Sequence, residues 1–280
     1  MTRAIVLLGL VLPGLALAGK KDKEPAVDPA HANHYKPVAP AGDDVKFGAE
    51  DAWARDAEAK AKLTIVNDSA DFVMFKVEES RFVLGGTEMV PKTGVLRGNV
   101  IVVDPKSSAN TVMAVTGAGL HHDSMQINVT GAYLVPKNAP VQKAPDFRLP
   151  LESSDLKAGN FSCAVPKKIK QETDETAVRF KCRYEGSGVG LVDAKQIQVR
   201  LEDGQLFAND DRNMKPQIVL PGDELNVDAT FHVSAKVVDM QFATMYLVFN
   251  ETFREGEPRA IEAAPLKLEL DPAMTAAKND

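Results

Sequence analysis

The 280-residue chain has few of the residues that mark nucleic-acid-binding or disulfide-rich proteins. It contains two cysteines and one tryptophan, and its formal net charge is −6. The longest basic cluster, residues 167–170, is followed at once by acidic residues. A nucleic-acid-binding surface needs clustered lysine and arginine, so we expect no nucleic-acid partner.

The sequence also lacks the short motifs of the common catalytic chemistries. It has no HExxH, no Walker loop, no dinucleotide fingerprint and no EF-hand spacing. Gly186-Ser187-Gly188 lacks the strand-to-helix context of a nucleophile elbow. We therefore expect no enzyme, no catalytic residues and no cofactor. A hydrolase with a site assembled from distant strands stays open, since only shifted carboxylate pKa values in a cleft would reveal it.

Long apolar runs are missing beyond the N-terminus. Residues 1–18 have the parts of a secretory signal peptide: Arg3, an apolar run from Ala4 to Leu12, and the small-residue pattern at residues 16–18. That run is shorter than the roughly 20 residues a membrane span needs. We therefore expect a periplasmic or extracellular protein without a transmembrane segment after signal removal.

Residues 19–61 are expected to be a disordered tether followed by one short helix. Residues 19–51 carry four prolines and many charged residues, so they offer little apolar surface to offset the entropy of ordering. The stretch from Glu50 to Lys62 is alanine-rich and has no proline or glycine, which favours a helix. Trp53 is expected to dock this helix on the first domain.

The clearest strand signal is the sequence LNVDATFHVSA at residues 225–235. Its apolar and polar residues alternate strictly, and a period of two puts all the apolar side chains on one face of a strand. Residues 240–249 are mostly apolar and are expected to form a second strand, inside a packed sandwich. The two strands are predicted to form a hairpin.

Short runs of this kind, separated by frequent turn signals, recur from residue 62 onward. This spacing is typical of antiparallel sandwiches. We predict an all-β chain with two antiparallel, immunoglobulin-like β-sandwich domains in tandem, at residues 62–135 and 155–271. Residues 136–154 carry four prolines and are expected to be the linker. Leucines alternate at the end of the second domain, predicting an edge strand, and residues 272–280 are expected to be a flexible tail.

The two cysteines are expected to form a structural disulfide. Cys163 and Cys182 fall on the apolar faces of consecutive predicted strands, beside Phe161 and Phe180. Cysteines of an exported chain usually pair, and the spacing is not that of a redox-active CxxC motif. Paired across neighbouring strands, they would fix the register of the hairpin.

The histidines are the remaining candidates for chemistry. His121 and His122 could bind copper or zinc, with Met125 as a further ligand to copper. Consecutive residues of a strand point to opposite faces, so the two histidines can share a metal only in a turn. The alternative is that both are exposed loop residues and that Met125 belongs to the core.

A weak internal repeat relates the two halves. The pattern of Met125-Gln126 and Tyr133-Leu134-Val135 parallels that of Met240-Gln241 and Tyr246-Leu247-Val248. Two sandwiches can also share such a pattern through physical constraints alone.

Two functions follow from these observations. The first is a non-catalytic binding or structural protein of the periplasm or cell exterior, whose partner is another exported or cell-envelope protein. The second is a periplasmic metal-handling protein that uses His121 and His122. The sequence leaves the oligomeric state open.

Overall fold

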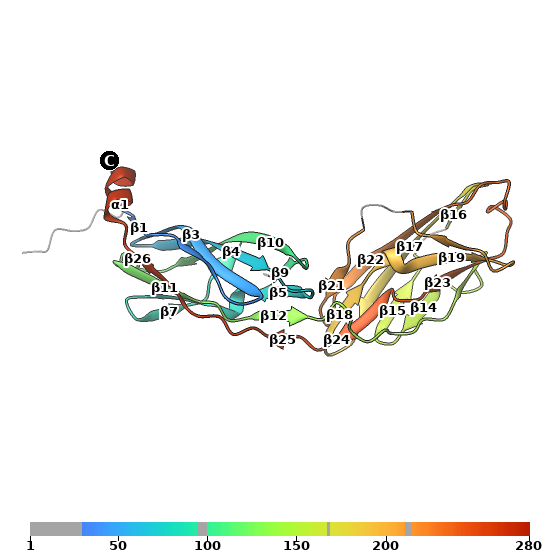
Figure 1. Cartoon of the computed structure of the whole chain (residues 1–280), viewed down its shortest axis with the longest axis horizontal. Coiled ribbons are helices and arrows are strands. Elements are labelled where there is room, and N and C mark those ends of the chain that lie inside the picture. The colour runs from blue at the N-terminus through green and yellow to red at the C-terminus, as the bar shows by residue number, and fades with distance from the viewer. Residues whose placement is uncertain (1–29, 94–99, 167–168, 211–213) are drawn as a thin grey trace, which may run out of the picture.

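The computed structural model describes residues 30–93, 100–166, 169–210 and 214–280. Within these ranges the chain is all-β, with antiparallel sheets and one α-helix, α1 (Pro272–Asn279). The strands gather in two lobes placed end to end, with α1 at one end of the molecule (Figure 1). The predicted signal peptide at residues 1–18 lies outside the described residues.

The N-terminal lobe lies at the left of Figure 1. Its largest sheet consists of β1 (Asn33–His34), β2 (Val38–Ala41), β3 (Val45–Arg55), β4 (Glu58–Asn67), β8 (Lys92–Thr93) and β10 (Ser107–Thr116). A second sheet has the order β26 (Leu266–Glu269), β11 (Ser124–Asn128), β6 (Arg81–Leu84) and β7 (Thr87–Met89). A third has the order β25 (Arg259–Ala260), β12 (Ala132–Val135), β5 (Phe72–Lys76) and β9 (Val100–Val103).

The C-terminal lobe is built in the same way. Its largest sheet consists of β14 (Asp155–Ala158), β15 (Phe161–Ala164), β16 (Lys170–Gln171), β17 (Glu175–Tyr184) and β22 (Glu224–His232). A second sheet has the order β13 (Phe147–Leu149), β23 (Met245–Phe249), β19 (Ile197–Leu201) and β20 (Leu206–Ala208). A third has the order β21 (Gln217–Val219), β18 (Val189–Val192) and β24 (Phe253–Gly256).

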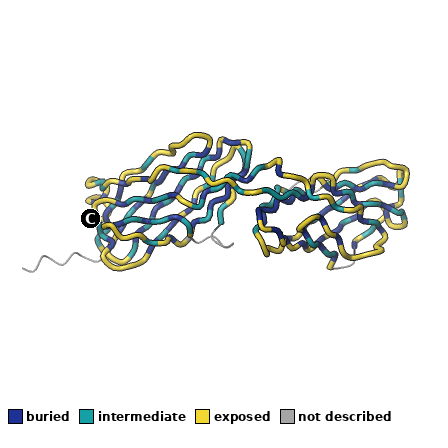
Figure 2. The backbone as a smooth tube through the Cα atoms, turned by 90° about the horizontal axis from the view of Figure 1, so that it is seen from below, coloured by how far each residue is buried: buried dark blue, intermediate teal, exposed yellow. Residues whose placement is uncertain are grey.

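Each lobe encloses its own cluster of buried apolar side chains. The alternation in the sequence generates these cores: every second residue of β4 is buried, as are alternate residues along β17 and β22. Figure 2 shows buried segments running through both lobes and exposed loops at their ends. The β-sandwich-like character expected from the alternation is therefore present in the structure.

The helix predicted at residues 50–62 is wrong, because this stretch forms the hairpin of β3 and β4. Ala59 and Ala61 continue the buried face that Leu63 and Ile65 occupy on β4. The helix propensity of alanine amounts to only a few tenths of a kcal/mol per residue, and burial in a sheet overrides it. Trp53 docks no helix and lies half-buried under the cations of Arg55 and Lys60.

The two predicted flexible segments are also ordered where the structure describes them. Residues 33–55 of the predicted tether and helix form β1, β2 and β3. The predicted tail forms α1, with Asp271 as the N-cap and Pro272 in the first turn. The Asp271 side chain accepts a hydrogen bond from the Met274 amide. An aspartate followed by proline is a helix-start signal as much as a strand-end signal.

The predicted hairpin between residues 225–235 and 240–249 is also wrong. β22 pairs with β17, whereas β23 pairs with β19 and β13 in another sheet. Residues 240–244 belong to the connection between the two sheets and not to a strand. The alternation of residues 225–235 and the apolar run of residues 240–249 predict strands but contain no information on their partners.

The two lobes repeat one topology. The pairing order β3–β4–β10 of the first lobe recurs as β15–β17–β22 in the second. Likewise β11–β6–β7 recurs as β23–β19–β20, and β12–β5–β9 as β24–β18–β21. A 3-10 helix follows β5 as η1 (Val77–Glu79) and β18 as η2 (Ala194–Gln196). In this correspondence Met125 is equivalent to Met245. The sequence repeat predicted above, which aligns Met125 with Met240, is therefore shifted by five residues from the structural repeat.

The segment that follows each repeat crosses to the other lobe. After β12, the chain bridges to β24 at Val141 and then adds β13 to β23. After β24, it pairs with β12 through β25 and then adds β26 to β11. The edge strand predicted near residue 266 therefore exists, but it completes the N-terminal lobe and not the C-terminal one.

The lobes meet through matching strands. Phe72 and Met74 of β5 and Val189 and Leu191 of β18 belong to one buried apolar cluster, together with Val135. The other two buried residues of β5, Val73 and Phe75, face the core of the N-terminal lobe. Both strands are thus buried on two faces, and equivalent elements contact each other as in an isologous dimer interface.

Candidate functional site

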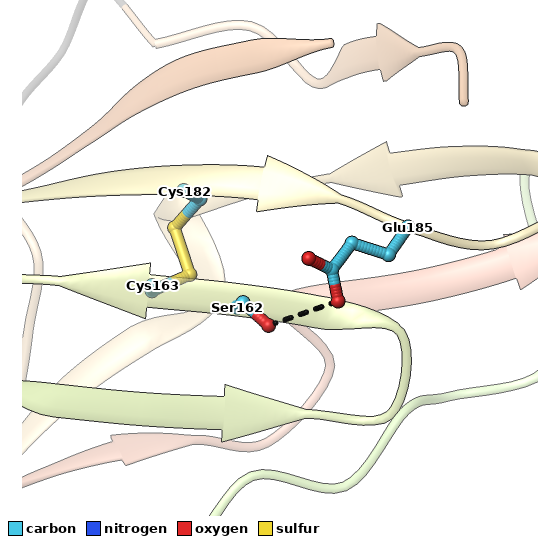
Figure 3. The surroundings of a disulfide bond; sticks show 4 residues. All are labelled: Ser162, Cys163, Cys182 and Glu185. Carbon is cyan, nitrogen blue, oxygen red and sulfur yellow. Dashed lines mark hydrogen bonds between the residues drawn. A yellow bond between two sulfur atoms is a disulfide. The ribbon is translucent and has the colours of Figure 1, made fainter. Parts of the chain in front are cut away.

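The predicted disulfide is present in the C-terminal lobe (Figure 3). Cys163 of β15 and Cys182 of β17 are direct cross-strand partners, with Cα atoms 3.9 Å apart. The neighbouring Phe161 and Phe180 are buried as expected. Both cysteines are buried, which suits a structural bond better than a reactive one. On the other face, the Ser162 hydroxyl lies 3.3 Å from a carboxylate oxygen of Glu185.

The predicted metal ligands lie at the end of the N-terminal lobe, in the connection between β10 and β11. This connection is held on the β3–β4 turn, because the Leu120 amide donates to the Asp56 carbonyl and Leu120 is buried. His121 meets His31, whose Nδ1 lies 2.9 Å from His121 Nε2. The two rings pack edge to face with centroids 5.1 Å apart. The sequence pattern gave no signal for this pairing, since 90 residues separate the two histidines.

His122 has a different environment from His121. Its ring lies over Gly85 in the β6–β7 turn, where an added Cβ would be 2.2 Å from His122 Nε2. Its carbonyl accepts hydrogen bonds from the Tyr35 hydroxyl at 2.7 Å and from the Asn33 side chain at 3.0 Å. These contacts attach the β10–β11 connection to β1. His122 therefore has a structural environment, and the structure brings His31 to His121 instead.

His34 is the fourth histidine at this end of the lobe. Partial burial lowers its pKa below the usual value, and the charges of Lys278 and His31 lower it further. Met125 is buried in the core between Leu84 and Leu268. Within the part of the chain that the structure describes, no group of three or more His, Cys, Asp or Glu side chains is arranged to hold a metal.

A second candidate surface lies at the end of the C-terminal lobe. We call residues 233–244, which connect β22 to β23, the Phe242 loop. Phe242 is 76% exposed and Val237 is 51% exposed. Met240 is fully buried and anchors the loop, its amide donating to the Thr173 carbonyl. The equivalent connection of the N-terminal lobe, residues 117–123, is shorter. The sequence pattern did not separate residues 240–244 from β23, because they continue its apolar run.

An apolar cleft of about 390 Å³ lies between β9 and β21. Val100, Val102 and Leu220 line it, and Glu224 is the acidic residue at its margin whose pKa is shifted. A hydrogen bond from Lys181 lowers the pKa of the Glu224 carboxyl. The shift comes from an exposed salt bridge and is opposite to the one that a general acid needs, so it does not identify Glu224 as a general acid.

No family model and no curated protein matches the chain. Among solved structures, the secreted serine protease VesC from Vibrio cholerae aligns at 11% identity, over 78% of this chain and 48% of the protease, with a TM-score of 0.18. This chain therefore spans about half of the protease's length. Red sea bream transglutaminase aligns at 9% identity over 69% of this chain and 27% of its own, also with a TM-score of 0.18. Streptomyces albus HEPD, determined with 2-hydroxyethylphosphonate and Fe(II), aligns at 8% identity over 88% of this chain and 76% of the HEPD chain, with a TM-score of 0.12. Similarity at this level supports no functional argument.

Proposed function

We propose that the chain is an exported, non-catalytic binding protein built from two immunoglobulin-like sandwich domains, and that it binds its partner through the Phe242 loop. The observation that carries this proposal is the exposure of Phe242 on a loop anchored by buried Met240. Aromatic residues, phenylalanine included, are enriched in protein interfaces, and Val237 adds a second exposed apolar side chain to the same loop.

The position of the loop fits this role. Gln171 of β16 donates to the Met240 carbonyl, and β16 lies at the end of the molecule opposite α1 (Figure 1). β1, at the start of the described chain, lies beside α1. The Phe242 loop and the start of the described chain therefore lie at opposite ends of the molecule.

Export is supported by the signal-like residues 1–18 and by the buried disulfide, because disulfides persist in oxidising compartments. Among the described residues, α1 is the one α-helix, and it is too short and too polar to span a bilayer.

A photo-cross-linking residue at position 242 tests the binding proposal. Val112 offers a matched control, since it is 53% exposed on β10 of the N-terminal lobe, away from the loop. The expected result is one cross-linked exported protein from position 242 and none from position 112. Purified partner should then bind the Phe242→Ser variant at least tenfold more weakly than the Val112→Ser variant. Equal binding by both variants would show that the loop is not the contact surface.

Metal handling remains the second candidate, and the contact between His31 and His121 is the observation that favours it. Both nitrogens could ligate Cu²⁺ or Zn²⁺ after a small movement of the rings, because imidazole suits either ion. Titration of the metal-free protein with each ion tests this. Binding should disappear in His121→Ala and persist in His232→Ala, whose histidine lies on β22 in the other lobe. Binding that survives replacement of both His121 and His122 would exclude the predicted site.

A further inference from the structure

The N-terminal lobe is completed by a strand that arrives from the other lobe. β26 pairs with β11 over four residues, Leu266 to Glu269. Leu266 and Leu268 are buried in the core of the N-terminal lobe. Without β26, Met125 and Ile127 of β11 would lose their cross-strand partners on one side. The lobe therefore contains an acceptor groove for an extended segment with leucines at every second position.

Contacts at the far end of the segment fix its register. The Lys36 amide donates to the Glu269 carbonyl at 2.8 Å, and the Asp271 amide donates to the His34 carbonyl at 2.8 Å. Farther along α1, the Thr275 hydroxyl accepts from the His34 amide and the Asn279 side chain bonds the backbone of Ala32. The N-terminal lobe thus binds this segment as a strand, β26, followed by a helix, α1.

The connection that carries this segment runs along the surface of the N-terminal lobe. Between β24 and β26, residues 257–265 have two register pairs to the N-terminal lobe, at Arg259 and Ala260. Their side chains are exposed or half-buried, and Pro258 and Pro265 lack an amide donor. The Ile261 amide also donates to the Ala132 carbonyl, and Ile261 and Ala263 pack partly buried on the N-terminal core. Opening the connection therefore breaks these contacts together with those of β26 and α1.

We infer that a second copy of this chain can fill the acceptor groove, so that two copies exchange residues 257–280. The groove makes the same contacts whichever copy supplies the strand, which is the condition for domain swapping. The segment at residues 136–149 shows that the fold already uses this arrangement, because it completes the C-terminal lobe in the same way. This inference is independent of the Phe242 loop.

The experiment uses single-cysteine variants of the full chain. Gln126 of β11 and Lys267 of β26 are cross-strand partners on the outer face. Cysteines at directly opposed positions have Cβ atoms about 4.5–5.5 Å apart, close enough for a disulfide to form. The two native cysteines are already paired with each other. Gln126→Cys and Lys267→Cys proteins are unfolded together, refolded together in a glutathione redox buffer, and analysed by mass spectrometry.

The connection keeps the strand of the same chain at an effective concentration on the order of 1 mM, so refolding is done at high protein concentration. The expected product is a covalent dimer joining position 126 of one copy to position 267 of the other. The yield of this dimer should be several-fold higher than that from a control pair, Gln126→Cys with Glu262→Cys. Glu262 is exposed and has no partner on β11.

The double variant Gln126→Cys/Lys267→Cys completes the test. It should close a disulfide within one chain when it is refolded at low concentration. If it closes and the mixed variants give no more dimer than the control pair, strand exchange between copies is refuted. If it does not close, the pairing of β26 with β11 is itself refuted, and the inference with it.

Discussion

Leu149 and Leu268 make the same contact in opposite lobes. Leu149 of β13 pairs with Met245, and Leu268 of β26 pairs with Met125. Each methionine has a leucine on its other side, Leu201 in one lobe and Leu84 in the other. Each donated leucine comes from the segment that follows the repeat of the other lobe. The molecule therefore has the organisation of a strand-exchanged dimer within one chain.

This relationship predicts that Leu268→Ala lowers the stability of the N-terminal lobe, although the residue follows the C-terminal repeat in the sequence. Removing the buried side chain should cost about 2–5 kcal/mol. Hydrogen exchange should rise in β11 and β6 of the N-terminal lobe and stay unchanged in β23 and β19. Lys267→Ala, on the exposed face of the same strand, is the control. Faster exchange in β23 would contradict the placement of β26.

The disulfide predicts a loss of stability confined to the C-terminal lobe. Cys182→Ala removes a cross-link that closes a loop with a sequence separation of 19 residues. In the chain-entropy model the free energy of unfolding should fall by about 2–4 kcal/mol. Urea unfolding of the variant, followed by hydrogen exchange in each lobe, checks this expectation. Two free thiols in protein taken from the exported fraction would refute the bond.

Stability should fall as the pH drops below about 6.5, the ordinary pKa of histidine. Burial, with Lys278 and His31, lowers the pKa of His34 in the folded chain. The unfolded chain then binds more protons in the window between the two pKa values, so protonation favours unfolding there. The stability contributed by neutral His34 is complete above the unfolded pKa and is lost as the pH falls toward the folded value.

Urea midpoints at pH 7.5 and pH 5.5 measure this effect. His34→Gln should reduce the difference between the two midpoints. Lys278→Met should reduce it less, because burial is the larger cause of the shift. If His34→Gln leaves the difference unchanged, other groups determine the pH dependence.

Local patterns predicted the elements of this fold better than their partners. The disulfide hairpin was predictable because both cysteines lie on alternating strands that neighbour each other in the chain. The destination of β26 was not, since alternating leucines define a buried face without naming the sheet that buries it. The contact between His31 and His121 was hidden for the same reason, because it depends on how β1 docks beside a distant connection.

Composition misled where it conflicted with burial. The alanines of β4 favour a helix when they are considered alone, yet they share a face with Leu63 and Ile65. The pattern predicts a strand for residues 240–244 of the Phe242 loop because Met240 and Phe242 are apolar. Met240 is buried and Phe242 is exposed, and that difference appears only once the β22–β23 connection is placed.

The last prediction concerns the packing of His122 on Gly85. Gly85 and Gly86 both have positive φ, +55° and +82°, so an alanine at either position carries the backbone cost of a left-handed conformation. That cost is about 1–2 kcal/mol. Only at position 85 would the added Cβ meet the His122 ring, because at position 86 no heavy atom lies within 4 Å. Gly85→Ala should therefore destabilise the chain by a further 1–3 kcal/mol or so, the usual cost of overpacking. Replacing His122 by alanine in the same chain should recover part of that difference, measured as the coupling energy of a double-mutant cycle in urea. Equal destabilisation by Gly85→Ala and Gly86→Ala would show that the ring of His122 does not pack on this turn.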